Sequence, residues 1–365
     1  MALVFQPGAL LMRGDSGKVA VTIVTYNSAR FIRQCLDWVL DQDYPKLEAI
    51  VVDNASTDDT ATILRDFEDR VRVIYNRQNV GFAAGQNQAI FLSDADWILV
   101  LNPDVRLTPG FIATLVSGGG ADPSTGSLCG KLLAMSETGE LPAQPVFDSA
   151  GIYFTPNLRH FDRGSHEADT GQHNRREYVF GATGAAALYR RDMIRDISID
   201  GEFFDADFFA YREDADLAWR AQLLGWKCLY VPDAVAYHVR HVLPSNRRAL
   251  SPVINMHSVK NRFLMRIKNM TGDLYRRHWL RITWRDLLVV GASLTYEFSS
   301  LRAFPVVLRS LRHTWAKRRE IMSRRCAGDD YMAAWFANTA VSLPAPTRDL
   351  RTEPGPVSLG KRRGI

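Results

Sequence analysis

The densest group of side chains able to do chemistry lies at residues 208–217, where the sequence reads FFAYREDADL. Glu213, Asp214 and Asp216 fall at the start of a predicted helix, directly behind aromatic residues that limit solvent. A carboxylate in such a place can act as a general base toward a hydroxyl group. The helix dipole also favours carboxylates at a helix N-terminus, which accounts for one or two of the three without catalysis.

A second candidate is Asp104, which ends the sequence LNPD after an apolar run. Pro103 restricts the turn and presents Asp104 at the tip of the predicted strand. Magnesium typically takes one or two carboxylates plus substrate phosphates, so Asp104 suits a metal that holds a diphosphate. The alternative is an ordinary turn or helix-cap aspartate. His238 ends a later apolar segment, VPDAVAYH, and is either a metal ligand or a buried core histidine.

Polar residues also follow the first two apolar runs of the chain. Thr25, Tyr26 and Asn27 end the first run, and Asp53 ends the second. A pyrimidine base can stack on Tyr26 while Asp53 accepts a hydrogen bond from its ring N–H. The alternative is that Asp53 merely forms a turn before the next helix.

The segment NVGFAAGQN follows the third apolar run and contains Asn79, Gly81 and Gly85. Its small residues at a predicted helix start would let the backbone approach a diphosphate closely. Helix starts of this composition are common, so the segment is a weak signal when taken singly.

The spacing of apolar residues predicts the elements that position these groups. We expect strands at 18–27, 47–52, 71–75 and 97–101, alternating with helices at 29–42, 58–67 and 81–93. This alternation predicts an α/β fold with a mostly parallel, doubly wound sheet, in which ligands bind at the carboxyl ends of the strands. The later expectations are a loop-bearing segment at 118–176 with one strand at 127–133, order at 178–189, a helix at 214–224, a strand at 226–231 and a final segment ending at His238.

The chain divides by charge. Residues 1–245 contain 22 Lys/Arg and 32 Asp/Glu, whereas residues 246–365 contain 23 Lys/Arg and 8 Asp/Glu. We therefore predict a loose tail at 1–17, a catalytic domain at 18–245, a basic helical region at 246–345 and a disordered basic tail at 346–365. The four cysteines are widely separated, which argues against a disulfide framework or a structural zinc site.

Apolar residues at helical spacing between Asp286 and Trp315, with Pro305 expected to break the series, lie among many arginines and lysines. Such a basic amphipathic helix is typical of a segment that rests on an anionic membrane surface. The alternative is that its apolar stripe packs on the catalytic domain. No apolar run reaches the length of a membrane span. Phosphate neutralisation by the same charges would suit nucleic acid, but no recognition motif accompanies them, so nucleic acid is not expected.

Five motifs in this order, VTYNS, VVDNASTD, NVGFAAGQN, LNPD and FFAYREDADLAWR with VPDAVAYH behind it, resemble bacterial family 2 glycosyltransferases, especially rhamnosyltransferase-like members. The resemblance covers about residues 18–270. It implies a GT-A fold, an inverting glycosyl transfer from a nucleotide sugar (dTDP-rhamnose or a UDP-hexose), a Mg²⁺ or Mn²⁺ ion, and a glycan or lipid-linked acceptor. It also implies work in cell-surface polysaccharide synthesis. The isolated cysteines suggest reduced thiols in the cytoplasm, and the basic helices suggest a place on the inner face of the inner membrane.

The resemblance also implies roles for individual residues. Asp214 would be the catalytic base, Glu213 and Asp216 would shape the acceptor pocket, and Asp104 and His238 would hold the metal. The nucleotide-sugar site would comprise Thr25, Tyr26, Asn27, Asp53, Asn79, Gly81, Gly85 and Asn102. Asn102 departs from the D-x-D pattern frequent in the family and leaves one fewer charge near the cation.

Two other classes of protein compete with this interpretation. A nucleotide-binding oxidoreductase is disfavoured because the turn after the first strand reads TYNS rather than G-x-G-x-x-G. A catalytically idle nucleotide-sugar-binding protein would keep the base-binding motifs and lose the carboxylates, yet Asp104 and Asp214 are both present.

Overall fold

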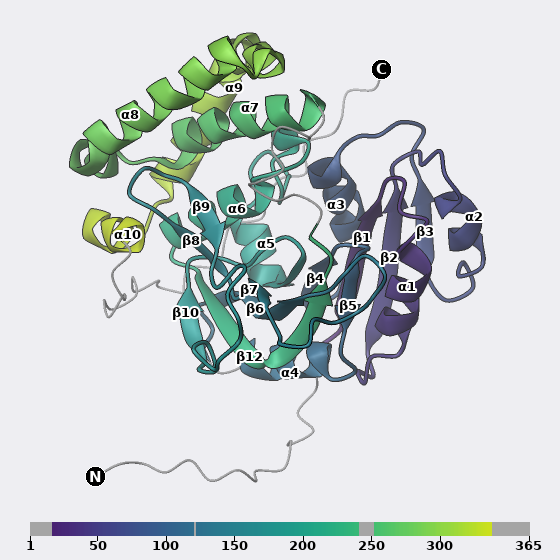
Figure 1. Ribbon diagram of the computed structural model, residues 1–365. Helices are drawn as coiled ribbons and strands as arrows, with labels where there is room; N and C mark the ends of the chain where they lie inside the picture. The colour runs from purple at the N-terminus through teal and green to yellow at the C-terminus, as the bar shows by residue number, and fades with distance from the viewer. Residues whose placement is uncertain (1–16, 120–121, 241–251, 338–365) are drawn as a thin grey trace, which may run out of the picture.

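The computed structural model describes residues 17–119, 122–240 and 252–337. Its strands are β1 (Val19–Thr25), β2 (Leu47–Asp53), β3 (Arg72–Tyr75), β4 (Trp97–Leu101), β5 (Val105–Leu107), β6 (Thr125–Ala134), β7 (Phe147–Ser149), β8 (Ile152–Phe154), β9 (His160–Asp162), β10 (Glu177–Val179), β11 (Ala186–Arg190) and β12 (Lys227–His238). Ten of them form one sheet, with the main order β10-β12-β6-β11-β4-β1-β2-β3, while β8 and β9 form a separate hairpin (Figure 1).

The sheet is mostly parallel, as predicted. Strand β1 pairs in parallel with β2 and β4, and β2 pairs in parallel with β3. Strand β11 enters antiparallel between β4 and β6, and β6 pairs in parallel with β12. Strands β1, β2 and β4 therefore end at one edge, which brings the polar residues that follow them together.

Helices cover both faces of the sheet: α1 (Ile32–Leu40), α2 (Thr60–Arg65), α3 (Phe82–Phe91), α4 (Phe111–Gly119), α5 (Arg191–Ile197) and α6 (Glu213–Leu223). Helices α1, α2 and α4 bury apolar side chains on one face, such as Leu36 and Phe111. Helices α3, α5 and α6 do so on the other, through residues such as Met193 and Leu217. Apolar periodicity thus specifies both cores.

The middle of the chain differs from the prediction. Residues 118–176 contain strands β6 to β9 rather than one short strand in a long loop. The region 178–189 contains β10 and β11 with a glycine-rich turn between them. The predicted strand 226–231 and the segment after it form the single strand β12, whose register shifts between Val231 and Val235. These strands pair with partners far away in sequence, so local pattern carries little information about them.

The C-terminal region is helical, with α7 (Pro252–Asn269), α8 (Gly272–Thr295), a short 3₁₀ helix (Phe298–Arg302), α9 (Ala303–Ser323) and α10 (Asp329–Phe336). Helices α7, α8 and α9 lie together at one end of the sheet (Figure 1). The predicted break at Pro305 is wrong, because this residue lies in the first turn of α9, where a proline costs no hydrogen bond. The break falls at residues 296–297 instead.

Most of these C-terminal helices pack on the α/β domain that contains the large sheet. Trp219 of α6 shares a buried cluster with Met265 of α7, Ile321 of α9 and Phe336 of α10. Helix α8 differs, because it leaves large apolar side chains exposed, namely Trp279, Leu280, Trp284, Leu287, Leu288 and Leu294. Among the described helices, none is both long and apolar enough to span a membrane. The tails predicted at residues 1–17 and 346–365 lie almost entirely outside the described residues.

A buried network of charges joins the two parts of the chain. Asp216 of α6 accepts a hydrogen bond from Arg220 at 3.1 Å, and the Lys268 ammonium of α7 lies 2.9 Å from the same carboxylate. Lys268 also contacts Asp205, which accepts a second bond from Lys317 of α9 at 2.5 Å. Burial would raise the pKa of Asp205, but the charges of both lysines outweigh it and lower that pKa.

Removal of one lysine from this network should destabilise the protein. We expect Lys268→Met to lower the free energy of unfolding by about 3–5 kcal/mol, because Asp205 and Asp216 would keep buried charge without their shared cation. Urea unfolding of the full chain measures this change. The control is Lys18→Met, which removes an exposed lysine that pairs with Asp94 and should cost less than about 1 kcal/mol. Equal losses in the two variants would contradict the prediction.

Candidate active site

The ends of β1 and β2 meet at the predicted nucleotide site. Thr25 lies opposite Asp53 in the parallel register. The buried carboxylate of Asp53 accepts hydrogen bonds from Thr25 Oγ1 at 2.8 Å, from Ser56 Oγ at 2.5 Å and from the Ser56 backbone N–H at 3.1 Å. Asp53 therefore stabilises the turn that follows β2, which was the alternative to a role in nucleotide binding. A carboxylate has about four acceptor positions, so one remains for a ligand.

Tyr26 and Asn27 lie at the same edge and differ in their surroundings. Asn27 takes a positive φ of 53°, and its Oδ1 accepts a hydrogen bond from the Thr57 backbone at 2.8 Å. That bond ties the turn after β1 to the turn after β2. The Tyr26 side chain is 51% exposed and so presents a ring face on which a base can stack.

The glycines of the NVGFAAGQN segment serve packing within the chain. Gly81 has a φ of +87°, and a Cβ there would lie 2.6 Å from the Phe209 carbonyl oxygen. A Cβ on Gly85 would lie 2.9 Å from Val24. The expectation that these glycines let a diphosphate approach is therefore incomplete, since protein atoms already occupy the space. Asn79 accepts a hydrogen bond from the Gly81 N–H at 2.9 Å and so shapes the same turn.

The two predicted metal ligands lie face to face. Strand β5 pairs antiparallel with β12 so that Val105 lies opposite His238. This register places the preceding residue, Asp104, beside the imidazole, with 3.4 Å between Asp104 Oδ1 and His238 Nε2. One oxygen and one nitrogen ligand leave room for phosphate oxygens, which is the set that Mg²⁺ or Mn²⁺ takes in a nucleotide site. No group of three or more His, Cys, Asp or Glu suited to a metal occurs among the described residues.

Asp148 of β7 orients His238. Its Oδ2 lies 2.8 Å from His238 Nδ1, which leaves Nε2 directed at Asp104. Burial alone would lower the pKa of His238, but the charge of Asp148 and the bond to Asp104 raise that pKa to about 10. A carboxylate behind a histidine in this way fixes the ring of a metal ligand. A cation that binds at Nε2 must displace a proton.

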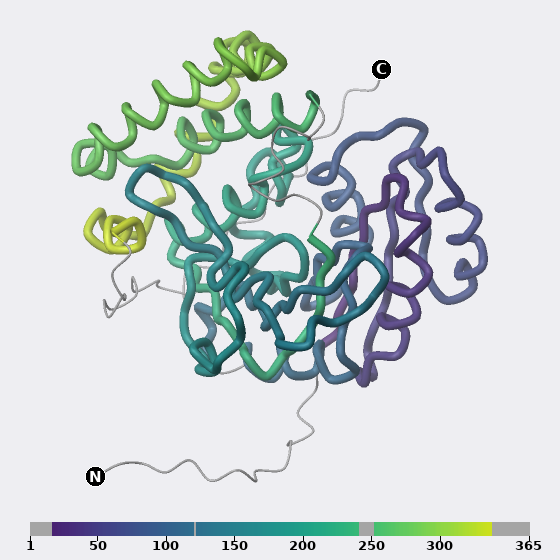
Figure 2. The backbone as a smooth tube through the Cα atoms, in the orientation of Figure 1, coloured from purple at the N-terminus to yellow at the C-terminus, as the bar shows by residue number. Residues whose placement is uncertain are grey.

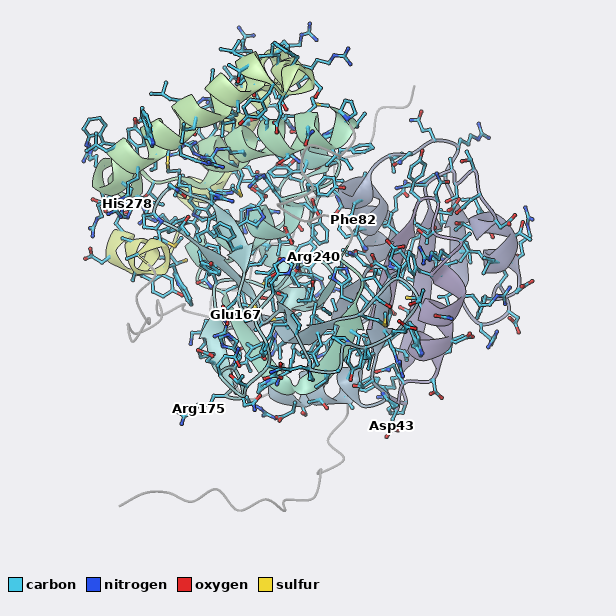
Figure 3. All side chains as sticks on the ribbon, in the orientation of Figure 1. Asp43, Phe82, Glu167, Arg175, Arg240 and His278 are labelled. Carbon is cyan, nitrogen blue, oxygen red and sulfur yellow. The ribbon has the colours of Figure 1, made fainter. Side chains whose placement is uncertain are left out.

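Arg240 and Asp162 continue this chain of contacts. Arg240 donates to Asp148 at 2.5 Å and to Asp162 of β9 at 2.7 Å. Figure 3 shows Arg240 near the centre of the molecule, below the stacked C-terminal helices. Burial raises the pKa of Asp214 most, and the charge of Asp162 raises it further. Contacts of Asp162 thus connect the predicted metal ligands with the predicted base.

Helix α6 begins after an unusual stretch of backbone. Phe209, Tyr211 and Arg212 all have positive φ, between 65° and 70°. Asn261 of α7 holds this stretch by donating to the carbonyls of Phe208, Ala210 and Tyr211. Strain of this kind persists only where the surroundings enforce it, and it is concentrated at functional sites. Here it lies directly before the first turn of α6, which contains Asp214.

Asp214 is fixed next to the end of β4. Its Oδ2 accepts a hydrogen bond from the Gly184 N–H at 3.0 Å, while the adjacent Ala185 carbonyl accepts one from the Asn102 N–H at 2.9 Å. Two consecutive residues therefore bridge the Asn102–Asp104 turn and Asp214. Burial raises the pKa of Asp214, which makes the carboxylate a stronger base.

The other two carboxylates of the cluster differ from each other. Asp216 is fully buried and surrounded by Arg220, Lys268 and Asn269, so the prediction that it lines an acceptor pocket is wrong. Glu213 lies beside Asp214, and within the described part of the chain its Oε2 has no hydrogen-bond partner. Burial, followed by the charge of Asp214, raises the pKa of Glu213 to about 8.

Sequence reasoning missed Asp148, Asp162, Gly184 and Arg240. The first two lie in the segment 118–176, where glycine, proline and serine obscure any period. Arg240 follows His238 by two residues, so the i, i+2 spacing of an extended strand was a usable signal. Gly184 acts only through its backbone N–H, which no sequence pattern reveals.

Comparison with known proteins points to one family. Residues 20–198 match the family model described as "Glycosyl transferase family 2". Among similar proteins is the Mycobacterium tuberculosis "N-acetylglucosaminyl-diphospho-decaprenol L-rhamnosyltransferase", 27% identical over 241 residues, which are 60% of this chain and 76% of that protein. Another is the Staphylococcus epidermidis "Poly-beta-1,6-N-acetyl-D-glucosamine synthase", 20% identical over 63% of this chain and 52% of that protein.

Among solved structures, that of GalNAc-T7 with UDP, GalNAc and Mn²⁺ superposes with a TM-score of 0.56 at 12% identity. The match covers 72% of this chain and 50% of that chain. At this identity the likeness concerns the fold alone. The fold is the predicted GT-A arrangement, with a helical C-terminal region.

The raised pKa of Glu213 has a consequence for stability. Between its ordinary value of 4.5 and about 8, the folded protein holds a proton that the unfolded chain has lost. The free energy of unfolding therefore falls as pH rises through this window. Glu213→Gln should remove this contribution, so its stability should exceed that of the wild type increasingly from pH 4.5 to 8.

Urea unfolding at several pH values measures this difference. Glu140→Gln, a change at an exposed glutamate, is the matched control and should follow the wild type at every pH. If Glu213→Gln keeps the full pH dependence of the wild type, the buried carboxyl does not titrate as described.

Proposed function

Because the chain belongs to glycosyl transferase family 2, we propose that it moves a sugar from a nucleoside diphosphate sugar to a hydroxyl of a glycan or lipid-linked acceptor, with inversion at the anomeric carbon. The activities named for its relatives support a role in cell-surface polysaccharide synthesis. The rhamnosyltransferase among them favours dTDP-rhamnose as donor, with UDP-hexoses as the alternative.

The observation that carries this proposal is the bridge made by Gly184 and Ala185. One residue binds Asp214, and the next binds Asn102, two residues before Asp104. A carboxylate able to take a proton is thereby held beside a pair of side chains able to hold a metal. Glycosyl transfer needs these two groups close together, because the acceptor hydroxyl attacks the carbon from which the diphosphate departs.

In the proposed mechanism, Asp214 accepts the proton of the acceptor hydroxyl as its oxygen attacks the anomeric carbon. Attack on the face opposite the leaving diphosphate inverts the configuration in one step. Asp104 and His238 would hold Mg²⁺ or Mn²⁺, which when bound neutralises the charge that develops on the diphosphate. Asp148 keeps the His238 ring turned toward that position.

The nucleotide would lie over the ends of β1 and β2. The exposed Tyr26 ring would stack on the base, and Asp53 would accept its ring N–H. Thr25 and Asn27 would hold the two turns in place through the bonds to Asp53 and Thr57. Asn102 would contact the ribose or a metal-bound water. We also propose that the protein works in the cytoplasm, on the inner face of the membrane. The exposed apolar side chains of α8, which lie among arginines, support contact with an anionic membrane surface.

Donor binding and hydrolysis across UDP-, dTDP- and GDP-sugars, with Mg²⁺, with Mn²⁺ and with EDTA, test this function. We expect one donor to bind and to turn over only with metal. Asp214→Asn should reduce transfer roughly 10²- to 10⁴-fold while donor binding survives. The control is Asp192→Asn, at the first turn of α5, which should transfer normally. Near-normal turnover in Asp214→Asn would exclude Asp214 as the base.

Metal dependence is tested separately at Asp104. We expect Asp104→Ala to weaken Mn²⁺-dependent donor binding at least about tenfold, because the cation loses its only carboxylate from the Asn102–Asp104 turn. Calorimetric titration of the donor with and without Mn²⁺ measures this effect. Asp43→Ala, at an exposed position remote from Arg240 in Figure 3, is the control. Unchanged metal dependence in Asp104→Ala would show that the cation binds elsewhere.

A further inference from the structure

A large cavity lies beside the candidate active site and shares Asp162 and Arg240 with it. It has a volume of about 990 Å³ and opens between the β8–β9 hairpin and helices α7 and α8. Figure 2 shows the hairpin running close beneath these helices. Tyr211 and Arg212, which lead directly into the base at Asp214, form part of its wall. The cavity therefore adjoins the acceptor side of the site.

The walls of this cavity are rich in positive charge. They contain five arginines and three carboxylates. One of the carboxylates, Asp162, is already paired with Arg240. Toward α7 the cavity leads to a recess of about 80 Å³ lined by Arg159, Arg212, Arg262 and Arg285, together with His160 and Ser258. Four guanidinium groups around so small a space form a site for an anion with several oxygens.

In the described part of the chain, two arginines of the recess keep guanidinium donors without a partner. Arg262 is almost fully buried and shares the single carboxylate of Asp286 with Arg266. Across the described residues, neither Arg262 Nε nor Arg285 Nε has a hydrogen-bond partner, and no carboxylate forms an ion pair with Arg285. A buried guanidinium nitrogen without a hydrogen-bond partner is costly, and an anion would offset that cost.

Arg212 and His160, which also line the recess, reflect the same excess of positive charge. Arg212 donates to the Ser258 carbonyl at 3.1 Å and lies 3.0 Å from His160 Nδ1. Burial, and then the charges of Arg212 and Arg159, hold the pKa of His160 well below its usual value. His160 is therefore neutral at pH 7, and its accepting nitrogen orients Arg212 toward the recess.

The opposite wall of the cavity is apolar and continues to the surface. Leu288, Val289 and Ala292 of α8 line it. Leu288 is itself 46% exposed and borders the exposed apolar face that carries Trp284 and Leu287. A ligand whose charged group sits in the recess thus has an apolar path from the cavity across α8.

We propose that this cavity binds the diphosphate of a lipid-linked acceptor, with the arginines of the recess on the phosphate oxygens and the polyprenyl chain leaving past Leu288 over α8. The proposal rests on the proposed function and adds the chemical class of the acceptor. A sugar joined to that diphosphate would extend past Arg212 toward Asp214, two residues further along the chain. The same exposed face of α8 would meet the membrane that supplies the lipid.

Calorimetric titration of the full-length protein with farnesyl diphosphate, farnesol and inorganic pyrophosphate tests the site. We expect farnesyl diphosphate to bind tightest, since it alone has both the diphosphate and the apolar chain. Arg285→Gln should weaken its binding roughly 10- to 100-fold, as for loss of a charged hydrogen-bond donor. Arg281→Gln, one turn earlier on α8 and outside the cavity, should bind like the wild type. Arg159→Gln is the second test variant should Arg285→Gln fail to fold.

The outcomes distinguish failure of this cavity proposal from failure of the proposed function. Wild-type binding of pyrophosphate as tight as that of farnesyl diphosphate would overturn the lipid acceptor, and equal binding of farnesol would overturn the role of the arginines. If a nucleotide sugar binds but farnesyl diphosphate does not, the cavity proposal fails while the function stands. If farnesyl diphosphate binds and no nucleotide sugar does, the proposed function fails while the diphosphate site stands.

Discussion

Buried charge pairing between the α/β domain and the C-terminal helices is the interaction on which the rest of this structure depends. Asp205 and Asp216 lie inside the protein, where a carboxylate is costly without cations. Lys268 and Lys317 supply those cations from helices that follow much later in the chain. The C-terminal region therefore completes the interior of the fold, and among its described helices α8 exposes the most large apolar side chains.

The same pairing helps to fix the position of Asp214. Lys268 and Asn269 end α7 and hold Asp216, while Asn261 on that helix binds the strained backbone before α6. Asp214 lies between these two anchors. The proposed base is thus positioned from behind by α7 and from the front by Gly184. A carboxylate held on both sides reorganises little when charge moves, which is the condition for effective electrostatic catalysis.

The alternating strands and helices up to Leu101 were predictable because each apolar run there is long and regular. The proposed role of Asp104 came from its place after an apolar run, and that of Asp214 from its place at a helix start together with the family resemblance. The approach of Asp104 to His238 depends on the register between β5 and β12, which no local pattern encodes. The prediction that Asp216 shapes the acceptor pocket was wrong for a related reason, since its partners Lys268 and Asn269 lie more than fifty residues away in the sequence.

Phe209 connects the proposed donor side of the site with the segment that leads to Asp214, and this connection affects the order in which the two substrates bind. Its carbonyl accepts a hydrogen bond from Ala83 at the start of α3 and lies against Gly81, while the following residues lead to Asp214. A movement of α3 on donor binding would reach the backbone before Asp214, the proposed base, through this carbonyl. Donor and acceptor would therefore not bind independently, and the enzyme would favour an ordered sequence in which the nucleotide sugar enters first.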